Sequence, residues 1–515
     1  MAWQISSIVG QSLSNTRQVI TILGRRITIP LHTLNMSGQR VAKPPKGIMP
    51  GAAKQMLASS KVSIDSHAAE SRSELSEFLY RISIFAPDIL KPFTFLYGPK
   101  MKLFYNFFIY VYAALIRLAS LFNPQAKQFL SGRKGEFRKM KAAVGESDEI
   151  VWFHCASVGE FEQARPVIEA FKKSFPTYKI LLTFFSPSGY ELRKNYELAD
   201  FVFYLPMDKA ANARRFMNIF HPRLAIFIKY EYWFNYIDEI YKAGIPLYFV
   251  SAIFRKQQHF FLFYGSWFRK QLRKVTWFFV QNEISDELLS QIGIQNHEIS
   301  GDTRFDRVFK VLESPFELHE MEVFKGNNDL LVAGSTWPSD EDILLSYLKK
   351  ESENFKLLLV PHKIDENHIT EILKKFERFS PVRFSQSNEK KLSESKVLVM
   401  DKMGLLSGLY RYANLAYVGG GFGVGIHNLL EAAVYGLPVL FGPNHERFQE
   451  ANDLLTLGGG FTIKNEEEFR FLIDRLRNET DFYKQASTVS KGYVTGHSGA
   501  TGKVILKMKE YLIKK

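Results

Sequence analysis

The segment IVWFHCASVGE, residues 150–160, runs from a short apolar stretch through a small loop to an acidic residue. The apolar stretch IVWFH (150–154) is typical of a strand that is buried on both faces of a sheet. The loop after it contains glycine and opens a helical pattern, with Glu160 in the first turn. This order of strand, loop and helix predicts one unit of a parallel α/β sheet.

The same pattern repeats along the chain in two series. The strands predicted for the first series are IVWFH (150–154), KILLTFF (179–185), FVFYL (201–205), LAIFI (224–228) and PLYFV (246–250), with helical patterns near 161–174, 188–198, 208–220 and 234–243. The strands predicted for the second series are LLVAG (330–334), FKLLLV (355–360), KVLVM (396–400), LAYVGG (415–420) and PVLFG (438–442). Apolar strands separated by helices of this length predict an α/β fold with two doubly wound, Rossmann-like domains.

The two series set the expected domain limits. A polar stretch at 313–328 separates them, and a last helical pattern near 481–515 is expected to return to the first domain. The expected parts are an extension (1–100), a membrane-anchoring helix (101–125), an N-terminal Rossmann-like domain (126–315), a C-terminal Rossmann-like domain (316–480) and a C-terminal helix (481–515).

Length and composition restrict the class of protein. The chain has 515 residues, 46% of them hydrophobic and 23% charged, which excludes collagen-like and wholly disordered classes. Because Cys155 is the only cysteine, an intrachain disulfide and a cysteine-based zinc site are excluded, and a reducing compartment fits. The net charge of +14 indicates an anionic partner, which composition leaves open among nucleic acid, phospholipid and a phosphorylated small molecule.

The first hundred residues differ from the rest. They carry 12 Lys and Arg against 5 Asp and Glu, are rich in Ser, and show only short apolar runs. One interpretation is an organelle transit peptide, which is basic and poor in acids. The other is an extension translated ahead of a start at Met101. Both interpretations predict little packed structure here.

A long apolar segment, LFYNFFIYVYAALIRLASLF, occupies residues 103–122. As a helix it would be about 30 Å long, which is enough to cross a hydrocarbon core. A basic flank at 127–141 follows, with Glu136 as its single acid. By the positive-inside rule that flank is cytoplasmic, and it suits anionic headgroups. We expect membrane attachment; a full span, an interfacial helix and a buried core helix remain open.

Candidate residues of the first domain follow predicted strands, because ligands of doubly wound sheets bind outside the carboxyl ends of the strands. Glu160 fits either a general base at the mouth of a cleft or a carboxylate that complements a helix dipole. Glu231 lies among large aromatic residues and fits either a perturbed acid or a surface residue. Arg304 fits either an anion contact or an ion pair with Asp302 or Asp306.

In the second domain, Ser335 and Thr336 end a predicted strand and precede Pro338, a favoured first residue of a helix. Their hydroxyls and the amides beside them fit a phosphate site. The segment 340–342 forms a DxD pattern, which binds a metal in many sugar-nucleotide enzymes. It falls in the first turn of a predicted helix, where acids are favoured electrostatically, so we expect no metal site there.

A glycine-rich turn, beginning with Gly419 and Gly420, follows a later strand and allows close approach of backbone to a phosphate or sugar. No Gly-Lys-Ser/Thr follows it, so it is not a Walker loop. Asn428 and Glu431 lie three residues apart on one helical face, where Glu431 could bind ribose hydroxyls. Pro361-His362 ends another predicted strand.

Together these motifs resemble those of the 3-deoxy-D-manno-octulosonic acid (Kdo) transferases of lipopolysaccharide synthesis. The resemblance runs from about residue 101 to the C-terminus and leaves 1–100 uncovered. Its carriers are Ser157-Val158-Gly159-Glu160, Glu231-x-Trp233-x-Asn235, Gly301-Asp302-Thr303-Arg304-Phe305-Asp306, Gly334-Ser335-Thr336, and Gly419-Gly420 through His427-Asn428-x-x-Glu431. Their order and spacing are specific to the family.

The resemblance implies a GT-B fold, in which an acceptor domain and a CMP-sugar domain face a cleft, preceded by an N-terminal membrane helix. It implies a metal-independent, inverting transfer of Kdo from CMP-Kdo to lipid IVA in lipopolysaccharide core synthesis. We therefore expect no cofactor and no nucleic-acid partner. The expected location is the cytoplasmic face of the bacterial inner membrane, in contact with its anionic lipids.

The resemblance also implies roles for individual residues. Glu160 is the implied proton acceptor, and Glu231 or its neighbour and Arg304 are implied to stabilise the transition state. Part of the expected CMP-binding set is implied by the resemblance. The rest are the residues at predicted strand ends that are described above. The expected CMP-binding set is Ser335, Thr336, Pro361, His362, Met403, Gly404, Leu405, Gly419, Gly420, Asn428, Leu429, Leu430 and Glu431.

Three positions depart from the family pattern. Lys229 occupies a position at which the family commonly has an acid. Which residue acts near the leaving phosphate is therefore left open. Arg304 replaces a common Lys and keeps the charge, but excludes proton donation. Pro361-His362-Lys363 replaces a Pro-Arg-His order. A sugar-nucleotide epimerase or other GT-B enzyme and a nucleotide-sensing module remain alternatives; the 103–122 segment counts against an epimerase, and Glu160 with its nucleotide cleft counts against the module.

Overall fold

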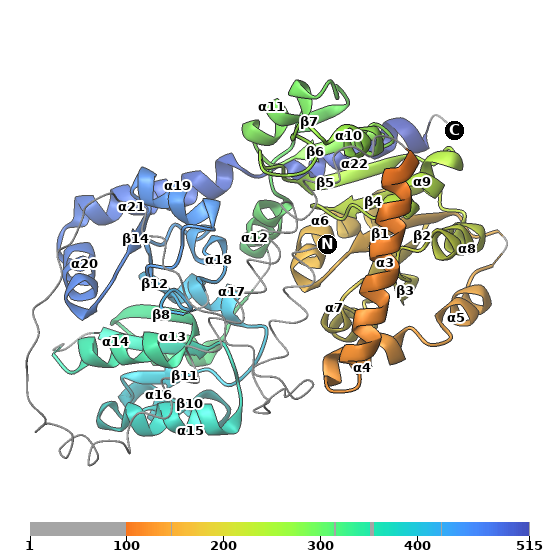
Figure 1. Cartoon of the computed structure of the whole chain (residues 1–515). Helices are drawn as coiled ribbons and strands as arrows, with labels where there is room; N and C mark the ends of the chain where they lie inside the picture. The colour runs from red at the N-terminus through yellow and green to blue at the C-terminus, as the bar shows by residue number, and fades with distance from the viewer. Residues whose placement is uncertain (1–98, 146, 314–315, 351–354, 424, 514–515) are drawn as a thin grey trace, which may run out of the picture. The chain divides into compact units, whose positions relative to one another are not determined.

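The computed structural model describes residues 99–145, 147–313, 316–350, 355–423 and 425–513 (Figure 1). The chain divides into two compact units between Lys134 and Gly135. The predicted extension 1–100 lies outside the described residues except for its last two positions.

The first unit contains the helices α3 (Pro99–Ala119) and α4 (Pro124–Gly132). Residues 120–123 separate them, and Asn123 caps α4, because its side chain accepts the backbone N–H of Gln125 at 2.8 Å. By length and composition alone, 100–119 could cross a membrane, a test that some core helices of soluble proteins also pass. Apolar side chains of α3 are exposed at Leu103, Phe107, Phe108, Tyr110, Leu115 and Leu118. The helix ends three residues before the predicted limit at 122.

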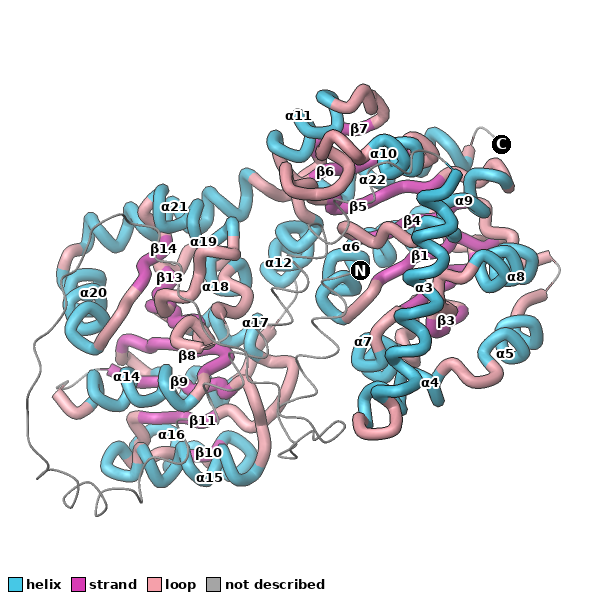
Figure 2. Tube along the Cα trace, viewed as in Figure 1, coloured by secondary structure: helices cyan, strands magenta, loops and turns pink. Residues whose placement is uncertain are grey.

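The second unit begins with a parallel sheet in the order β3-β2-β1-β4-β5-β6-β7 (Figure 2). Its strands are β1 (Ile150–Cys155), β2 (Lys179–Phe184), β3 (Phe201–Tyr204), β4 (Leu224–Ile228), β5 (Leu247–Ala252), β6 (Trp277–Val280) and β7 (His297–Ile299). The helices of this region are α5 (Glu136–Ala143), α6 (Val158–Ser174), α7 (Pro187–Arg193), α8 (Ala210–Phe220), α9 (Phe234–Lys242), α10 (Ser266–Leu272), α11 (Glu283–Gln291) and α12 (Thr303–Glu313).

A second parallel sheet follows in the order β10-β11-β9-β8-β12-β13-β14. Its strands are β8 (Asp329–Thr336), β9 (Phe355–Pro361), β10 (Val382–Arg383), β11 (Val397–Val399), β12 (Leu415–Val418), β13 (Val439–Phe441) and β14 (Gly460–Thr462). The helices are α13 (His319–Lys325), α14 (Pro338–Leu348), α15 (Glu366–Lys375), α16 (Glu389–Glu394), α17 (Leu406–Leu409), α18 (Leu430–Ala433), α19 (Gln449–Leu457), α20 (Glu466–Asn478), α21 (Thr480–Gly496) and α22 (Ala500–Leu512), with short 3-10 turns η3 (Glu377–Phe379), η4 (Phe384–Gln386) and η5 (Tyr410–Tyr412).

The predicted α/β fold with two doubly wound parallel sheets is confirmed. All ten predicted strands are present, with limits that differ by a few residues. The sequence analysis did not assign the strands β6, β7, β10 and β14. The helix predicted at 188–198 ends at Arg193, and the single helix predicted for 481–515 is two helices, α21 and α22.

Alternate residues of the central strand β8 enter different cores. Leu330 and Val332 belong to one buried cluster, whereas Leu331 and Ala333 belong to another. Successive side chains of a strand point to opposite faces, so both faces of the second sheet are covered by apolar packing.

The C-terminal helix α22 belongs to the core of the first sheet. Val504 and Met508 lie in the same buried cluster as Val151 and Phe153 of β1. Asp306 of α12 ties down the start of this helix, because its carboxylate accepts the backbone N–H of Thr501 at 2.6 Å. The chain therefore returns to the first domain after completing the second.

Each sheet has a point beside its first strand at which the strand order reverses. In the first sheet β1 lies between β2 and β4, and in the second β8 lies between β9 and β12. The loops after β1 and β4, and those after β8 and β12, begin there, and ligands of doubly wound sheets bind at such points, outside the carboxyl ends of the strands. Glu160, Glu231 and Gly419 lie in or just after these loops, and Ser335 is the second-last residue of β8.

Candidate active site

Glu160 lies in the first turn of α6 and is 6% exposed. Ser157 is the N-cap of this helix: its hydroxyl accepts the backbone N–H of Gly159 at 3.2 Å and donates to Oε2 of Glu160. The Ser-x-x-Glu spacing is typical of a helix N-terminus, so this contact also has a structural role. Oε1 of Glu160 has no hydrogen bond within the described chain, which leaves that oxygen for another group.

Glu231 follows β4 and is held against β1. The indole Nε1 of Trp233 lies 2.9 Å from Oε2 of Glu231 and 3.0 Å from Nε2 of His154. Because indole nitrogen only donates, Nε2 of His154 accepts, and the proton of a neutral imidazole is on Nδ1, which lies 2.9 Å from Oγ1 of Thr183. Glu231 is 2% exposed, so it is a buried carboxylate and not the surface residue that one interpretation expected.

The charges of Glu160 and Glu231 act on the same neighbours. Burial raises the pKa of Tyr230 well above its usual value, and the charges of Glu160 and Glu231 raise it further. Burial likewise raises the pKa of Cys155, to which the same two carboxylates add. The structure thus brings the two predicted acids into one electrostatic environment at the switch point of the first sheet.

Lys229 and Ser335 are among the residues at strand ends that have a strained backbone. Lys229, directly after β4, has φ of 63°, and Ser335, near the end of β8, has φ of 54°. Non-glycine residues rarely adopt this left-handed region, at a cost of about 1 kcal/mol or more. Ser335 is partly exposed, whereas Thr336 is buried and its hydroxyl donates to Glu341 at 3.3 Å. Ser335 is therefore the more accessible of the two predicted hydroxyls.

Asp340, the first acid of the DxD pattern, is fully buried and holds three donors. Its carboxylate accepts the backbone N–H of Trp337 at 2.9 Å, the backbone N–H of Gly420 at 2.9 Å and the hydroxyl of Tyr417 at 2.6 Å. Glu341 instead pairs with His368 at 3.0 Å. The described residues contain no group of three His, Cys, Asp or Glu side chains placed to hold a metal ion.

The glycine-rich turn packs against other backbone. A Cβ at Gly419 would lie 2.5 Å from the carbonyl oxygen of Ser335, and a Cβ at Gly421 would lie 2.6 Å from Cα of Gly442. Gly420 has φ of 92°, which glycine adopts without strain. These glycines let the loops after β8, β12 and β13 approach one another closely.

Three rings stack where β8, β9 and the glycine-rich turn meet. Trp337 stacks on His362 with centroids 4.9 Å apart, and His362 stacks on His427 at 4.3 Å. Burial and the neighbouring His362 lower the pKa of His427 to about 4, while burial and Lys363 lower the pKa of His362. Nε1 of Trp337 donates to Nε2 of His427 at 3.3 Å, which requires that nitrogen to be unprotonated. Both shifts favour the neutral form of these two imidazoles.

Asn428 and Glu431 are in contact at the start of α18, with Nδ2 of Asn428 3.0 Å from Oε1 of Glu431. Burial raises the pKa of Glu431; the charge of Glu162 adds to this rise, whereas Arg307 and the hydrogen bond from Asn428 oppose it. Glu162 is on α6, two residues after Glu160, and forms an ion pair with Arg307 of α12. Glu431 of the second domain is therefore electrostatically linked to the helix that carries Glu160.

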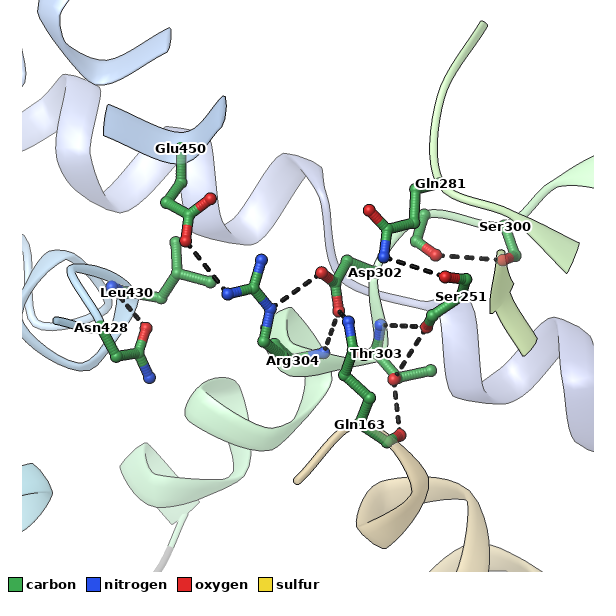
Figure 3. A network of polar contacts seen from close by, with 11 residues as sticks. Gln163, Ser251, Gln281, Ser300, Asp302, Thr303, Arg304, Asn428, Leu430 and Glu450 are labelled. Carbon is green, nitrogen blue, oxygen red and sulfur yellow. Dashed lines mark hydrogen bonds and ion pairs between the residues drawn. The ribbon is translucent and has the colours of Figure 1, made fainter. Parts of the chain in front are cut away.

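Arg304 lies in the first turn of α12 (Figure 3). Its Nε donates to Oδ2 of Asp302 at 2.8 Å, and its Nη1 donates to Oε1 of Glu450 at 3.1 Å. The predicted ion pair with Asp302 is confirmed. Asp306 does not pair with Arg304, because it binds backbone N–H groups at the start of α22.

The other members of the predicted CMP-binding set differ in how far their side chains are exposed. Leu429 and Leu430 are fully buried in the core of the second sheet, and the backbone N–H of Leu430 donates to Oδ1 of Asn428 at 3.1 Å. Met403 is 85% exposed, in the loop after β11 with Gly404 and Leu405. Pro361 is buried at the end of β9.

Sequence reasoning missed several residues of this region. Glu450 and Arg307 carry no local signal, because their partners lie far away in sequence. Trp337 was not singled out, although it directly precedes the predicted helix start at Pro338. His427 is part of the segment His427-Asn428-x-x-Glu431, but no role was assigned to it.

Comparison with known proteins agrees with this arrangement. A family model described as 3-deoxy-D-manno-octulosonic-acid transferase (kdotransferase) matches residues 129–307. The 3-deoxy-D-manno-octulosonic acid transferase of Aquifex aeolicus is 30% identical over 325 residues, covering 62% of this chain and 83% of that protein. The chain belongs to the Kdo transferase family. It is therefore a member of a glycosyltransferase family, as the motifs predicted.

Two further relatives of this Kdo transferase family member are matched over different shares of their own length. The Haemophilus influenzae 3-deoxy-D-manno-octulosonic acid transferase is 25% identical over 413 residues, covering 77% of this chain and 94% of that protein. A bifunctional glycosyltransferase/methyltransferase of Fusobacterium nucleatum is 28% identical over 353 residues; the match covers 65% of this chain and about half of the relative, 53%.

Among solved structures, the UDP-GlcNAc 2-epimerase of Neisseria meningitidis bound to UDP-GlcNAc aligns with a TM-score of 0.50 and 16% identity. The alignment covers 71% of this chain and 100% of that chain. At this identity the likeness concerns the fold alone, and it agrees with the two doubly wound domains of a GT-B protein.

Proposed function

We propose that this chain transfers Kdo from CMP-Kdo to lipid IVA by an inverting, metal-independent reaction. The observation that carries the proposal is the setting of Glu160. It lies at the switch point of the first sheet, with one oxygen held by Ser157 and the other without a described hydrogen bond. A carboxylate fixed in this way on a rigid helix is suited to general-base catalysis.

In the proposed step, the acceptor hydroxyl oxygen bonds to the anomeric carbon of Kdo while the bond from that carbon to the CMP phosphate oxygen breaks. The hydroxyl proton passes to Glu160. Attack on the face opposite to CMP inverts the configuration. The cation of Arg304 would stabilise negative charge that develops on the departing phosphate. Glu231, buried beside Trp233, would shape the electrostatic environment of the same centre.

The second domain would bind the CMP part of the donor. Near its switch point lie Ser335, the ring stack with His362 at its centre, and the Asn428–Glu431 pair. Glu431 would bind ribose hydroxyls. CMP leaves with a single phosphate, which needs a divalent cation less than a diphosphate does. Asp340 is already occupied by three donors, so it is not free to ligate a metal.

We also propose that the protein attaches to the cytoplasmic face of the bacterial inner membrane. The apolar helix α3 exposes large side chains, and the basic segment 127–141 follows it. The apolar helix suits the hydrocarbon region, and the basic segment suits anionic headgroups. Lipid IVA is a phosphorylated amphiphile, so its presence in the same membrane would bring the acceptor to the enzyme.

The test is incubation of the detergent-purified full chain with CMP-Kdo and lipid IVA, with and without EDTA, followed by mass spectrometry of the lipid. We expect a lipid product heavier by one or more Kdo groups in both samples. Loss of product in EDTA alone would overturn metal independence. Consumption of CMP-Kdo that leaves lipid IVA unmodified would overturn the proposed transfer.

A further inference from the structure

The guanidinium of Arg304 is held between two carboxylates that come from different parts of the fold (Figure 3). Asp302 precedes α12 and accepts from Nε, whereas Glu450 lies in the first turn of α19 and accepts from Nη1. We call these three residues the Arg304 bridge. It connects the end of the first domain to a helix of the second.

The Asp302 side of the bridge is fixed by the first domain. Its Oδ1 accepts Nε2 of Gln163 on α6 at 2.9 Å and the backbone N–H of Arg304 at 2.9 Å. Burial alone would raise the pKa of Asp302, but the charges of Arg304 and Lys229 and these hydrogen bonds hold its pKa below the usual value. Asp302 is therefore a charged and rigid anchor. The hydroxyl of Thr303, which donates to the carbonyl of Gln163 at 2.6 Å, adds a second link to α6.

The Glu450 side of the bridge depends on one contact. Its side chain is 7% exposed, and Arg304 is its single hydrogen-bond and ion-pair partner among the described residues. A buried carboxylate that loses its only cation is strongly disfavoured. The pair would therefore separate only if the two domains moved apart and water entered between them.

The helix that carries Arg304 packs into the second domain on its apolar side. Phe305 and Val308 lie in the buried cluster that contains Leu430 and Ala451. One turn after Arg304, Arg307 pairs with Glu162 of α6. The helix α12 thus contacts both domains, and the direction of the Arg304 guanidinium depends on carboxylates from both.

We propose that Glu450 is a positioning residue, which directs the Arg304 guanidinium when the second domain is seated on the first. This inference rests on the proposed function, in which Arg304 faces the departing phosphate. Two acceptors on separate edges of a planar guanidinium fix its plane as well as its position. Arg304 held by Asp302 alone would rotate, and charge stabilisation in the reaction would weaken.

The test compares Glu450→Ala, Glu450→Gln and the matched control Glu479→Gln in the full chain. Glu479 is a half-exposed acid that forms an ion pair with Arg475, four residues earlier in the chain. Turnover, the affinity for CMP and the distance between domains are measured. For the distance, fluorophores are placed on Tyr241→Cys and Phe471→Cys, which are exposed positions, because the native Cys155 is buried.

We expect Glu450→Ala to lower kcat ~10–100-fold, the scale of a misplaced catalytic group, with unchanged CMP affinity and a broader distribution of interdomain distances. Glu450→Gln keeps an acceptor for Nη1, so its distances should match wild type and its kcat should lie between the two. The control should resemble wild type in all three measurements.

Two outcomes would overturn the inference. A fall in CMP affinity as large as the fall in kcat would mean that Glu450 contacts the donor directly. Unchanged distances and kcat in Glu450→Ala would mean that the pair positions nothing. If the wild type itself transferred no Kdo, the proposed function would fail, whereas the distance comparison would still show whether Glu450 joins the domains.

Discussion

The carboxylate of Asp340 accepts a hydrogen bond from the backbone N–H of Gly420 at 2.9 Å. One acid in the first turn of α14 therefore holds the start of the glycine-rich turn that follows β12. The same carboxylate also accepts from Trp337 and Tyr417. The pattern that resembles a metal-binding DxD motif is in this structure a joint between two loops of the second domain.

We predict that Asp340→Ala lowers the free energy of unfolding by roughly 2–4 kcal/mol, because three buried donors lose their acceptor. Urea unfolding of the variant and wild type measures this loss. Asp342→Ala is the control, since Asp342 is 68% exposed and pairs with Lys375. An equal loss in both variants would contradict the structural role of Asp340.

We predict that Glu160→Gln lowers turnover by about 100-fold or more, the scale of a positioned base, and leaves CMP affinity unchanged. The amide keeps the volume and can still accept from Ser157, so the fold should be preserved. Product formation and calorimetric CMP binding give the two quantities. Near-normal turnover would remove Glu160 from the mechanism and leave it as part of a helix cap.

Glu431→Ala should weaken CMP binding, because the variant loses the carboxylate proposed to hold the ribose. Titration of CMP into the variant, with Glu160→Gln as the comparison, separates a nucleotide contact from a catalytic one. If the Glu431 variant bound CMP as tightly as wild type, its carboxylate would serve only to hold Asn428 and the start of α18.

The free energy of unfolding of the second domain should decrease at acidic pH, because His427 has a lowered pKa in the folded protein. Its pKa in the folded protein, about 4, lies below the usual 6.5, so the unfolded chain binds more protons between these values. The free energy of unfolding should therefore decrease as the pH falls from about 6.5 to about 4, with no such contribution above 6.5.

His427→Gln should make this pH dependence shallower, because glutamine does not titrate and can still accept from Trp337. Urea midpoints at several pH values for both proteins measure the difference. His319→Gln is the control, since that imidazole is 68% exposed. Parallel pH curves for wild type and His427→Gln would contradict the prediction.

Deletion of residues 1–100 should preserve activity and membrane association, because the recognised motifs and the apolar segment lie beyond it. Deletion of 1–125 should release the protein from membranes, leaving at most salt-sensitive adsorption through the basic segment 127–141. Fractionation in low and high salt distinguishes these states. Salt-resistant binding by the longer deletion would place the anchor elsewhere.

The two doubly wound sheets were predictable because buried parallel strands are continuous apolar runs, and the helices between them have a regular length. Three of the four strands that were not predicted, β7, β10 and β14, have at most three residues. Two residues form β10, and β14 begins with glycine. The strand β6 lies in a region so rich in aromatic residues that its limits do not stand out.

The candidate site was predictable where partners are close in sequence. Ser157 and Glu160 are three residues apart, as are Asn428 and Glu431. Arg304 and Glu450 are 146 positions apart in the sequence, so no local pattern predicts their contact. Burial also decides which candidates remain accessible, and this depends on packing from distant segments.

The return of α22 to the first domain determines the order in which the protein is completed during synthesis. Val504 and Met508 supply part of the core beneath β1, although some 350 residues separate them from that strand. On the ribosome, the first domain emerges first but lacks this helix until the second domain has been made. The residues of the first domain that pack against α22 therefore lack this cover until the second domain has been made, so the first domain is completed last.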